Sequence, residues 1–159
     1  MFVICFAFHP RKLIFAAGGG SNDVKLFVLD PNGQVIRRLV LSGHTNDVYD
    51  IKFLENDRLT SASEDNLIKI WDTNSLTCLQ TIRAHEDSVR SLCLHPSGRI
   101  MVSASFDNKL IVWWLSDDNS SATQIQVLEG HHYGFEQVRF DPSGRQLVSS
   151  GSNKLIVWE

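Results

Sequence analysis

A six-residue pattern that opens with Asn and closes on an aromatic ring recurs along this chain at a nearly constant spacing. Three copies end on Trp and occupy residues 66–71, 108–113 and 153–158, with the sequences NLIKIW, NKLIVW and NKLIVW. A fourth copy, NDVKLF at residues 22–27, ends on Phe27 instead. Successive copies begin 42 to 45 residues apart. A repeat of this length predicts a β-propeller, in which each repeat builds one small sheet, or blade, and neighbouring blades bury each other's faces.

Composition and charge exclude several classes of protein. Of the 159 residues, 43% are hydrophobic and 21% are charged, as is typical of a globular protein. The net charge of −3 is spread along the chain, and Arg37-Arg38 is the nearest approach to a basic cluster, so we expect no nucleic-acid partner. The apolar run at residues 1–8 is too short to span a bilayer, and we expect neither a targeting segment nor membrane insertion.

Cysteine usage favours a reducing compartment. Cys5, Cys78 and Cys93 are an odd number, and each lies within an apolar strand segment rather than in a disulfide framework or a metal-ligand spacing. We therefore expect an intracellular protein, cytoplasmic or nuclear, that has no metal site and no cofactor.

Alternation of apolar and polar residues predicts the strands of each repeat. The second unit has strands at 48–53, 58–63, 67–72 and 78–83. The third has them at 89–94, 100–105, 110–114 and 125–128, with a polar loop at 116–123. The fourth has 135–140, 146–151 and 155–158. The predicted fold class is an all-β propeller with four blades at about 2–41, 44–83, 85–129 and 131–159, the last lacking its outer strand.

The chain resembles the WD-repeat family of β-propellers over nearly its whole length. Gly43-His44, Ala84-His85 and Gly130-His131 are similar to the Gly-His pair of that family, and Trp71-Asp72 matches its Trp-Asp pair. Trp113-Trp114 and Trp158-Glu159 depart from that pair in the second residue.

The resemblance implies a structural network of His, Ser, Asp and Trp side chains in each blade. The indole N–H needs an acceptor, and an imidazole can link the hydroxyl to the carboxylate. The matching residues are His44, Ser61, Asp65 and Trp71 in the second blade, His85, Ser103, Asp107 and Trp113 in the third, and His131, Ser149 and Trp158 in the fourth. The first blade has Ala17, Ser21 and Phe27 at the corresponding positions and no preceding His, so we expect apolar packing alone to hold it.

Three features of the sequence admit a functional interpretation as well as a structural one. His44, Ser61 and Asp65 are the residue types of a hydrolase triad, but the set recurs one blade later, so we expect no catalytic residues and no enzyme. Residues 18–20, three consecutive glycines, could cradle a phosphate, yet a strand rather than a helix follows, and we interpret them as a hairpin with positive φ. Aromatic residues such as Trp113 and Trp114 are expected to pack within the sheets rather than to stack on nucleic-acid bases.

The resemblance also implies a binding surface for a peptide or protein partner. In WD-repeat proteins the face that carries the His-bearing loops and the hairpins between the second and third strands is the usual docking surface, and we call it the loop face. The candidate partner-binding residues are Asp47, Tyr49, Glu64, Ser88, Arg90, Phe106, Tyr133 and Glu136. We expect Tyr49 and Phe106 to be the aromatic anchors; the alternative is that both rings pack against their own loops.

The predicted function is therefore a non-catalytic scaffold for protein–protein interaction. The alternative that the resemblance offers is a substrate-receptor subunit of a ubiquitin ligase or of a similar multiprotein complex. The residues after the Trp-Asp pair are Thr73-Asn74, so the Arg that would support this alternative is absent there. Four full blades need sixteen strands and fifteen are predicted, so we expect part of a larger ring, a homodimer of two half-rings, or a closed ring of four.

Overall fold

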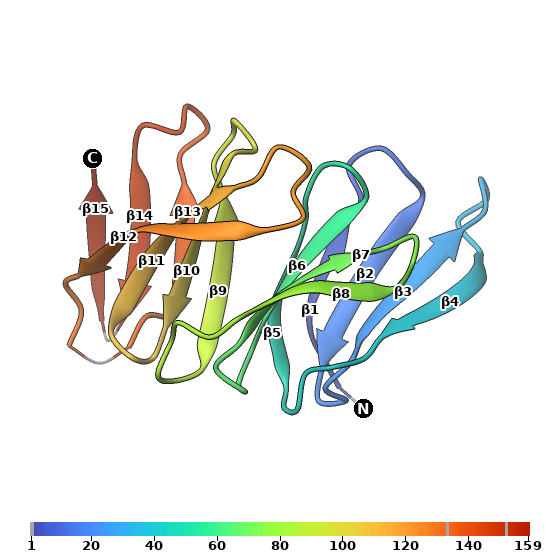
Figure 1. Ribbon diagram of the computed structural model, residues 1–159, viewed down its shortest axis with the longest axis horizontal. Helices are drawn as coiled ribbons and strands as arrows, with labels where there is room; N and C mark the ends of the chain where they lie inside the picture. The colour runs from blue at the N-terminus through green and yellow to red at the C-terminus, as the bar shows by residue number, and fades with distance from the viewer. Residues whose placement is uncertain (1, 133, 152) are drawn as a thin grey trace.

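The computed structural model describes residues 2–132, 134–151 and 153–159, and it confirms an all-β fold. Across these residues fifteen strands form four antiparallel sheets, and no helix occurs. Figure 1 shows the sheets side by side in sequence order, with the N-terminal sheet at one end of the molecule and the C-terminal sheet at the other. The arrangement is that expected for part of a β-propeller. Within the described part of the chain, no helix is long and apolar enough to cross a membrane.

Each sheet is built from strands that are consecutive in the sequence. The first sheet comprises β1 (Val3–Phe8), β2 (Ile14–Gly19), β3 (Val24–Leu29) and β4 (Val35–Leu41). The second comprises β5 (Val48–Phe53), β6 (Arg58–Ser63), β7 (Ile68–Asp72) and β8 (Thr77–Ile82). The third comprises β9 (Val89–Leu94), β10 (Ile100–Ser105), β11 (Lys109–Leu115) and β12 (Ala122–Glu129). The fourth comprises β13 (Gln137–Phe140), β14 (Leu147–Gly151) and β15 (Lys154–Trp158).

Apolar side chains are buried between neighbouring sheets rather than in one central core. Leu26, Ile51 and Trp71 belong to the cluster between the first two sheets. Ile70 and Trp113 belong to the cluster between the second and third, and other residues fill the interface between the third and fourth. Each sheet therefore depends on its neighbours for burial, as a repeated blade requires.

We call the first strand of each sheet its inner strand, namely β1, β5, β9 and β13. Three of these four strands carry a β-bulge near the start of the strand. In β5 the pairing with β6 skips a residue between Val48 and Asp50, and in β9 it skips one between Val89 and Ser91. The unpaired residues are Tyr49 and Arg90. A bulge redirects the side chain of its extra residue. At the loop face, the side chains of Tyr49 and Arg90 therefore depart from the regular alternation between the two faces of the sheet. The third bulge lies in β1.

The predicted hairpin at residues 18–20 is present only in part, because Gly20 alone lies in the turn that joins β2 to β3. Gly18 and Gly19 lie within β2, and none of the three glycines has a positive φ; Asn22, with φ of 62°, takes that conformation instead. These positions need glycine for space. A Cβ at Gly18 would lie 2.7 Å from Val48 Cγ1, and one at Gly19 would lie 2.3 Å from the Phe2 carbonyl oxygen. The hairpin is therefore confirmed at Gly20, whereas the positive φ predicted for these glycines was wrong.

Two further expectations need correction in the third sheet. The outer strand β12 begins at Ala122, so the polar loop is shorter than predicted and is closed by a hydrogen bond from the Ser116 N–H to the Ser121 carbonyl. Trp114 is 48% exposed and does not pack within the sheet. Its neighbour Trp113 is buried, because successive side chains of a strand point to opposite faces.

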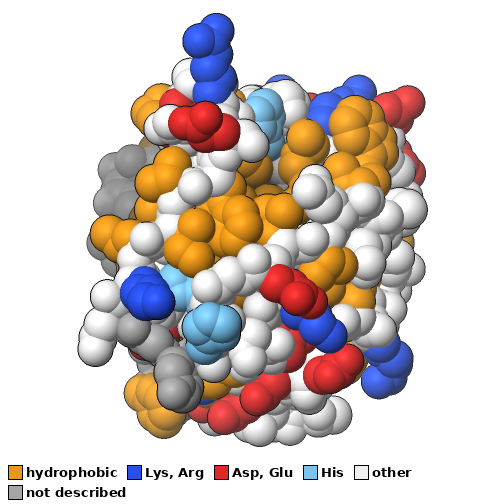
Figure 2. All heavy atoms as spheres, turned by 90° about the vertical axis from the view of Figure 1, so that its left-hand side faces the viewer, with side chains coloured by type: hydrophobic (Ala, Val, Ile, Leu, Met, Phe, Trp, Pro, Cys, Tyr) orange, Lys and Arg blue, Asp and Glu red, His pale blue; other side chains and the backbone are white. Residues whose placement is uncertain are grey.

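The outward faces of the first and last sheets expose apolar side chains. Phe6 and Phe8 on β1 are 67% and 65% exposed, and Leu155 on β15 is 74% exposed. Figure 2 views the molecule from the C-terminal end, where hydrophobic side chains gather across the middle of the face. These two faces lack the apolar cover that every internal sheet receives from its neighbours.

Candidate functional site

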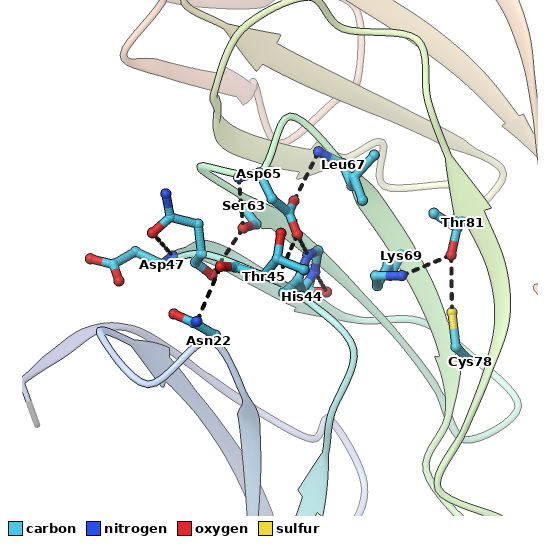
Figure 3. Close-up of polar contacts among 12 residues, drawn as sticks. Asn22, His44, Thr45, Asp47, Ser63, Asp65, Leu67, Lys69, Cys78 and Thr81 are labelled. Carbon is cyan, nitrogen blue, oxygen red and sulfur yellow. Dashed lines mark hydrogen bonds and ion pairs between the residues drawn. The ribbon is translucent and has the colours of Figure 1, made fainter.

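Four side chains of the second sheet form a continuous hydrogen-bonded network between the loop face and the core. The Trp71 Nε1–H donates to Ser61 Oγ at 2.8 Å, and His44 Nε2 lies 2.7 Å from the same oxygen. His44 Nδ1 lies 2.8 Å from Asp65 Oδ2. Figure 3 shows Asp65 directed at His44 from the hairpin between β6 and β7. Since an ionised carboxylate only accepts, Nδ1–H donates to Asp65 and Nε2 of a neutral ring accepts from Ser61.

The third sheet repeats this network with the same geometry. The Trp113 Nε1–H donates to Ser103 Oγ at 2.9 Å. His85 lies 2.7 Å from that oxygen and 2.8 Å from Asp107. Both serines are fully buried. Because each polar atom has a partner, the network adds rigidity at little desolvation cost.

The fourth sheet replaces the missing carboxylate with a main-chain carbonyl. His131 Nδ1 lies 3.1 Å from the Gly151 oxygen, and Nε2 lies 3.3 Å from Ser149 Oγ. The Trp158 Nε1–H still donates to Ser149, at 2.9 Å. In the first sheet Phe27 takes the place of the Trp and stacks on Phe15, with ring centroids 4.6 Å apart, and the nearby Ser21 hydroxyl is buried without a hydrogen-bond partner.

The network lowers the pKa values of its two carboxylates. Burial opposes the ionisation of Asp65, but hydrogen bonds from His44 and from the Thr45 and Leu67 N–H groups outweigh that effect and lower its pKa to about 2. Asp107 shows the same balance, and its pKa is also lowered. Both groups are therefore carboxylates at neutral pH. They are acceptors that orient a histidine and close a hairpin.

Recurring asparagines tie each sheet to the next, and the sequence analysis missed their role. Asn22, Asn66 and Asn108 each sit at a hairpin with a positive φ. The Asn22 amide donates to the Thr45 carbonyl, as Figure 3 shows, and the Asn66 amide donates to the Glu86 carbonyl. The Asn108 side-chain oxygen accepts from the Gly134 N–H. The signal was available, because every copy of the repeated pattern begins with Asn.

The geometry of the Ser, His and Asp sets does not provide a nucleophile. Ser61 Oγ is buried and already accepts from Trp71, so it is not presented to a substrate beside an oxyanion site. Burial raises the pKa values of the Cys5 and Cys93 thiols to about 12, which disfavours their reactive thiolates. Among the described residues, no group of three His, Cys, Asp or Glu side chains is placed to hold a metal ion.

Three of the predicted partner-binding residues form a stacked cluster at the loop face. The Arg90 guanidinium lies between two aromatic rings, with its Cζ atom 3.9 Å from the Tyr49 ring centroid and 4.2 Å from that of Phe106. We call these three residues the arginine clamp. Tyr49 is half-buried and Phe106 is 37% exposed. Phe106 also lies against Gly134, where an added Cβ would be only 2.6 Å from its ring.

The other predicted partner-binding residues surround the arginine clamp in different ways. Asp47 and Glu64 are partly exposed and are joined through the Glu64 N–H and the Asp47 carbonyl. Glu136 is exposed on the loop that leads into β13. Ser88 is buried, and its carbonyl accepts from the Phe106 N–H, so it supports the clamp rather than the surface. Tyr133 lies outside the described residues.

Comparison with known families decides the classification. The model of the WD domain, G-beta repeat, matches residues 33–72, 76–113 and 122–159, which is most of the chain. The chain belongs to the WD-repeat family. This family is generally non-enzymatic.

Curated relatives are about one-third identical to this WD-repeat chain over the aligned residues. The p21-activated protein kinase-interacting protein 1-like of Xenopus laevis is 34% identical over 64% of the chain and 28% of that protein. Pre-mRNA-processing factor 19 of Oryza sativa subsp. japonica is 30% identical over 79% of the chain and 23% of that protein. Nuclear distribution protein PAC1 of Arthroderma benhamiae is 29% identical over 70% of the chain. The chain therefore spans about a quarter of the length of these relatives.

The WD repeats are offset from the sheets. The matches begin in or just before β4, β8 and β12, the outer strands, and each continues into the first three strands of the following sheet. One repeat thus contributes to two neighbouring sheets and links them covalently. Residues 1–32, which include the strands that lack the His and Trp, fall outside the matches.

Proposed function

We propose that this WD-repeat chain is a non-catalytic scaffold that binds a peptide or protein partner on its loop face. The observation that carries the proposal is the arginine clamp, in which two aromatic rings from neighbouring sheets are held beside each other and Phe106 remains partly exposed. Large aromatic residues held rigidly at a surface are frequent anchors of protein interfaces. The buried networks beneath the loops give such an anchor a fixed position.

Relatives supply independent support for the class of function. The Xenopus laevis relative is named for its interaction with a kinase, and the others are named for pre-mRNA processing and nuclear distribution. We propose an intracellular location, cytoplasmic or nuclear, on the same grounds and because the cysteine usage suits a reducing compartment.

The proposal is tested by affinity capture with the intact chain and two variants. The Tyr49→Ala, Phe106→Ala double variant removes both rings, and its captured partners, quantified by mass spectrometry, are expected to fall at least about tenfold. Trp114→Ala is the matched control, because Trp114 is an exposed aromatic residue at the opposite end of β11 from the loop face. Equal capture by the double variant and the control would contradict the proposal.

We also propose that further blades cover the exposed faces of the first and last sheets. Phe6 and Phe8 at one end and Leu155 and Val157 at the other are the side chains such contacts would bury. These blades would come from a second copy or from another part of a larger ring. Solution mass at micromolar concentration tests the first source, and a monodisperse monomer would exclude it.

A further inference from the structure

The arginine clamp leaves one part of Arg90 without a partner. A guanidinium offers five N–H donors around the edge of its plane and accepts nothing. The Tyr49 and Phe106 rings lie against the guanidinium, with centroids 3.9 and 4.2 Å from Cζ, and an aromatic ring does not replace an oxygen acceptor for these donors. Arg90 Nε is buried without a hydrogen-bond partner, and in the described part of the chain no carboxylate forms an ion pair with this residue.

Several other cations of the molecule, unlike Arg90, pair with a carboxylate, although Arg58 Nε is also buried without a hydrogen-bond partner. Arg58 pairs with Asp72, and Lys109 pairs with Glu86. A partly desolvated guanidinium with open donors is costly unless an acceptor reaches it. The local structure therefore favours an acceptor from outside the described chain at this position.

Arg90 lines a cleft that runs along the inner strands. The cleft has a volume of about 270 Å³ and is lined from all four sheets, by residues of β1, β5, β9 and β13 and by the loop before β13. Its charged side chains are Asp50, Lys52, Arg90, Glu136 and Arg139. The formal charge of this lining is +1, from three cations and two carboxylates.

The remaining cations of the cleft are already engaged within the protein. Lys52 Nζ contacts Asp50, whose other oxygen accepts from the Leu92 N–H at 2.8 Å. The Arg139 guanidinium donates to Ser91 Oγ at 3.0 Å and to the Val138 carbonyl at 2.6 Å. Among the three cations of this lining, Arg90 is the one with neither a carboxylate nor a hydrogen-bond acceptor among the described residues. A single free guanidinium with a lining charge of +1 matches a monoanion better than a dianion.

We infer that Arg90 binds the carboxylate of an Asp or Glu side chain in an extended peptide that crosses the loop face. This inference rests on the proposed function and adds the chemistry of the partner. The guanidinium edge matches a carboxylate bidentately, and the stacked rings fix its orientation before binding, so little side-chain freedom is lost. The exposed edge of Phe106 lies where it can receive an apolar neighbour of the acidic residue.

The experiment begins with a randomised peptide library displayed on phage and selected on the intact chain. Selected peptides are expected to share an Asp or Glu, and synthetic copies are then measured by fluorescence polarisation. Replacing the acid by its amide is expected to weaken binding roughly 10- to 100-fold, because a hydrogen-bonded charge pair is lost. Arg90→Gln is expected to cost the same, and the amide peptide to lose nothing further on that variant.

Two additional variants sharpen the test. Arg90→Lys keeps the charge but not the planar fork, so it is expected to lose most of the affinity. Glu136→Gln removes the exposed carboxylate of the cleft lining and is expected to tighten binding of the acidic peptide about two- to fivefold. The amide-for-acid comparison on the unaltered chain remains decisive even if an Arg90 variant fails to fold.

The possible failures separate the two proposals. If selected peptides require Tyr49 and Phe106 but carry no shared acid and bind Arg90→Gln unchanged, the carboxylate inference is overturned and the loop-face function stands. A phosphoserine peptide that binds more than about tenfold tighter than its Glu counterpart would likewise overturn the assignment to a carboxylate. Peptides indifferent to Tyr49 and Phe106 would overturn the proposed function itself.

Discussion

Removing the Ser61 hydroxyl tests the account of the buried network most directly. Ser61 Oγ accepts from the Trp71 indole at 2.8 Å and bonds to His44 Nε2 at 2.7 Å. Ser61→Ala strands both nitrogen atoms in a region that is closed to water, since Ser61 is 0% exposed and Trp71 is 1% exposed. A buried polar group without a partner costs about 1–3 kcal/mol. The variant is therefore expected to lower the free energy of unfolding by about 2–5 kcal/mol.

Two comparisons isolate the hydrogen bonds from the loss of packing. Ser149→Ala removes the matching hydroxyl in the fourth sheet, where His131 Nε2 is 3.3 Å away and Trp158 is partly exposed, so a loss of about 1 kcal/mol is expected. Adding Trp71→Phe to Ser61→Ala removes one stranded donor and imitates Ala17 and Phe27 of the first sheet. The two losses are then expected to fall short of additivity by about 1–2 kcal/mol.

Equilibrium urea unfolding followed by far-ultraviolet circular dichroism measures all of these variants. A loss below about 1 kcal/mol for Ser61→Ala, or a loss equal to that of Ser149→Ala, would refute the argument. Such a result would mean that the hydrogen bonds seen in the second sheet are no stronger in effect than the poorer set in the fourth. The recurrence of Ser in three sheets would then need another explanation.

Two further predictions concern the carboxylates and the first interface between sheets. The pKa of Asp65 is lowered to about 2, so its stabilisation is present above the pKa of the unfolded chain, near 4, and is lost as pH falls through about 2. Asp65→Asn is expected to cost about 2 kcal/mol at neutral pH and to flatten the fall in the urea midpoint between about pH 5 and pH 2; an unchanged acid profile would contradict this. Gly18→Ala places a Cβ 2.7 Å from Val48 Cγ1 and is expected to cost about 1–3 kcal/mol. Combining it with Val48→Ala makes room, so the unfolding free energies of the double variant should show less than the summed losses, and strict additivity would disprove the close contact.

The sequence predicted the elements whose positions recur. Spacing between copies and alternation within them predicted the strand ends of the second sheet to within one residue, as in β5 and β6. The same recurrence selected His44, Ser61 and Trp71, which the structure brings within hydrogen-bond distance of one another. A repeat is informative because each copy solves the same packing problem, so residue types that return at one spacing share one environment.

Features that depend on one particular neighbour were missed or mistaken. Gly18 needs its small size because of Val48 in the next sheet, and no local pattern around residues 18–20 reveals that contact. Trp114 follows a buried Trp but points to the opposite face. The outer strand β12 begins three residues before the predicted position, because Ala122 pairs with Leu115 where the polar composition suggested a loop.

The arginine clamp shows why the place of a site can be read from a repeat while its chemistry cannot. The positions of Tyr49 and Arg90 correspond in their two repeats, since each is the extra residue of a bulge in an inner strand. Their residue types differ, so the recurrence says nothing about what they do together. Only the packing of the second sheet against the third brings the Tyr49 ring to 3.9 Å from Arg90 and turns two equivalent positions into a stacked pair. The binding chemistry of a repeat protein therefore arises where the copies differ, on a frame that their shared residues hold in place.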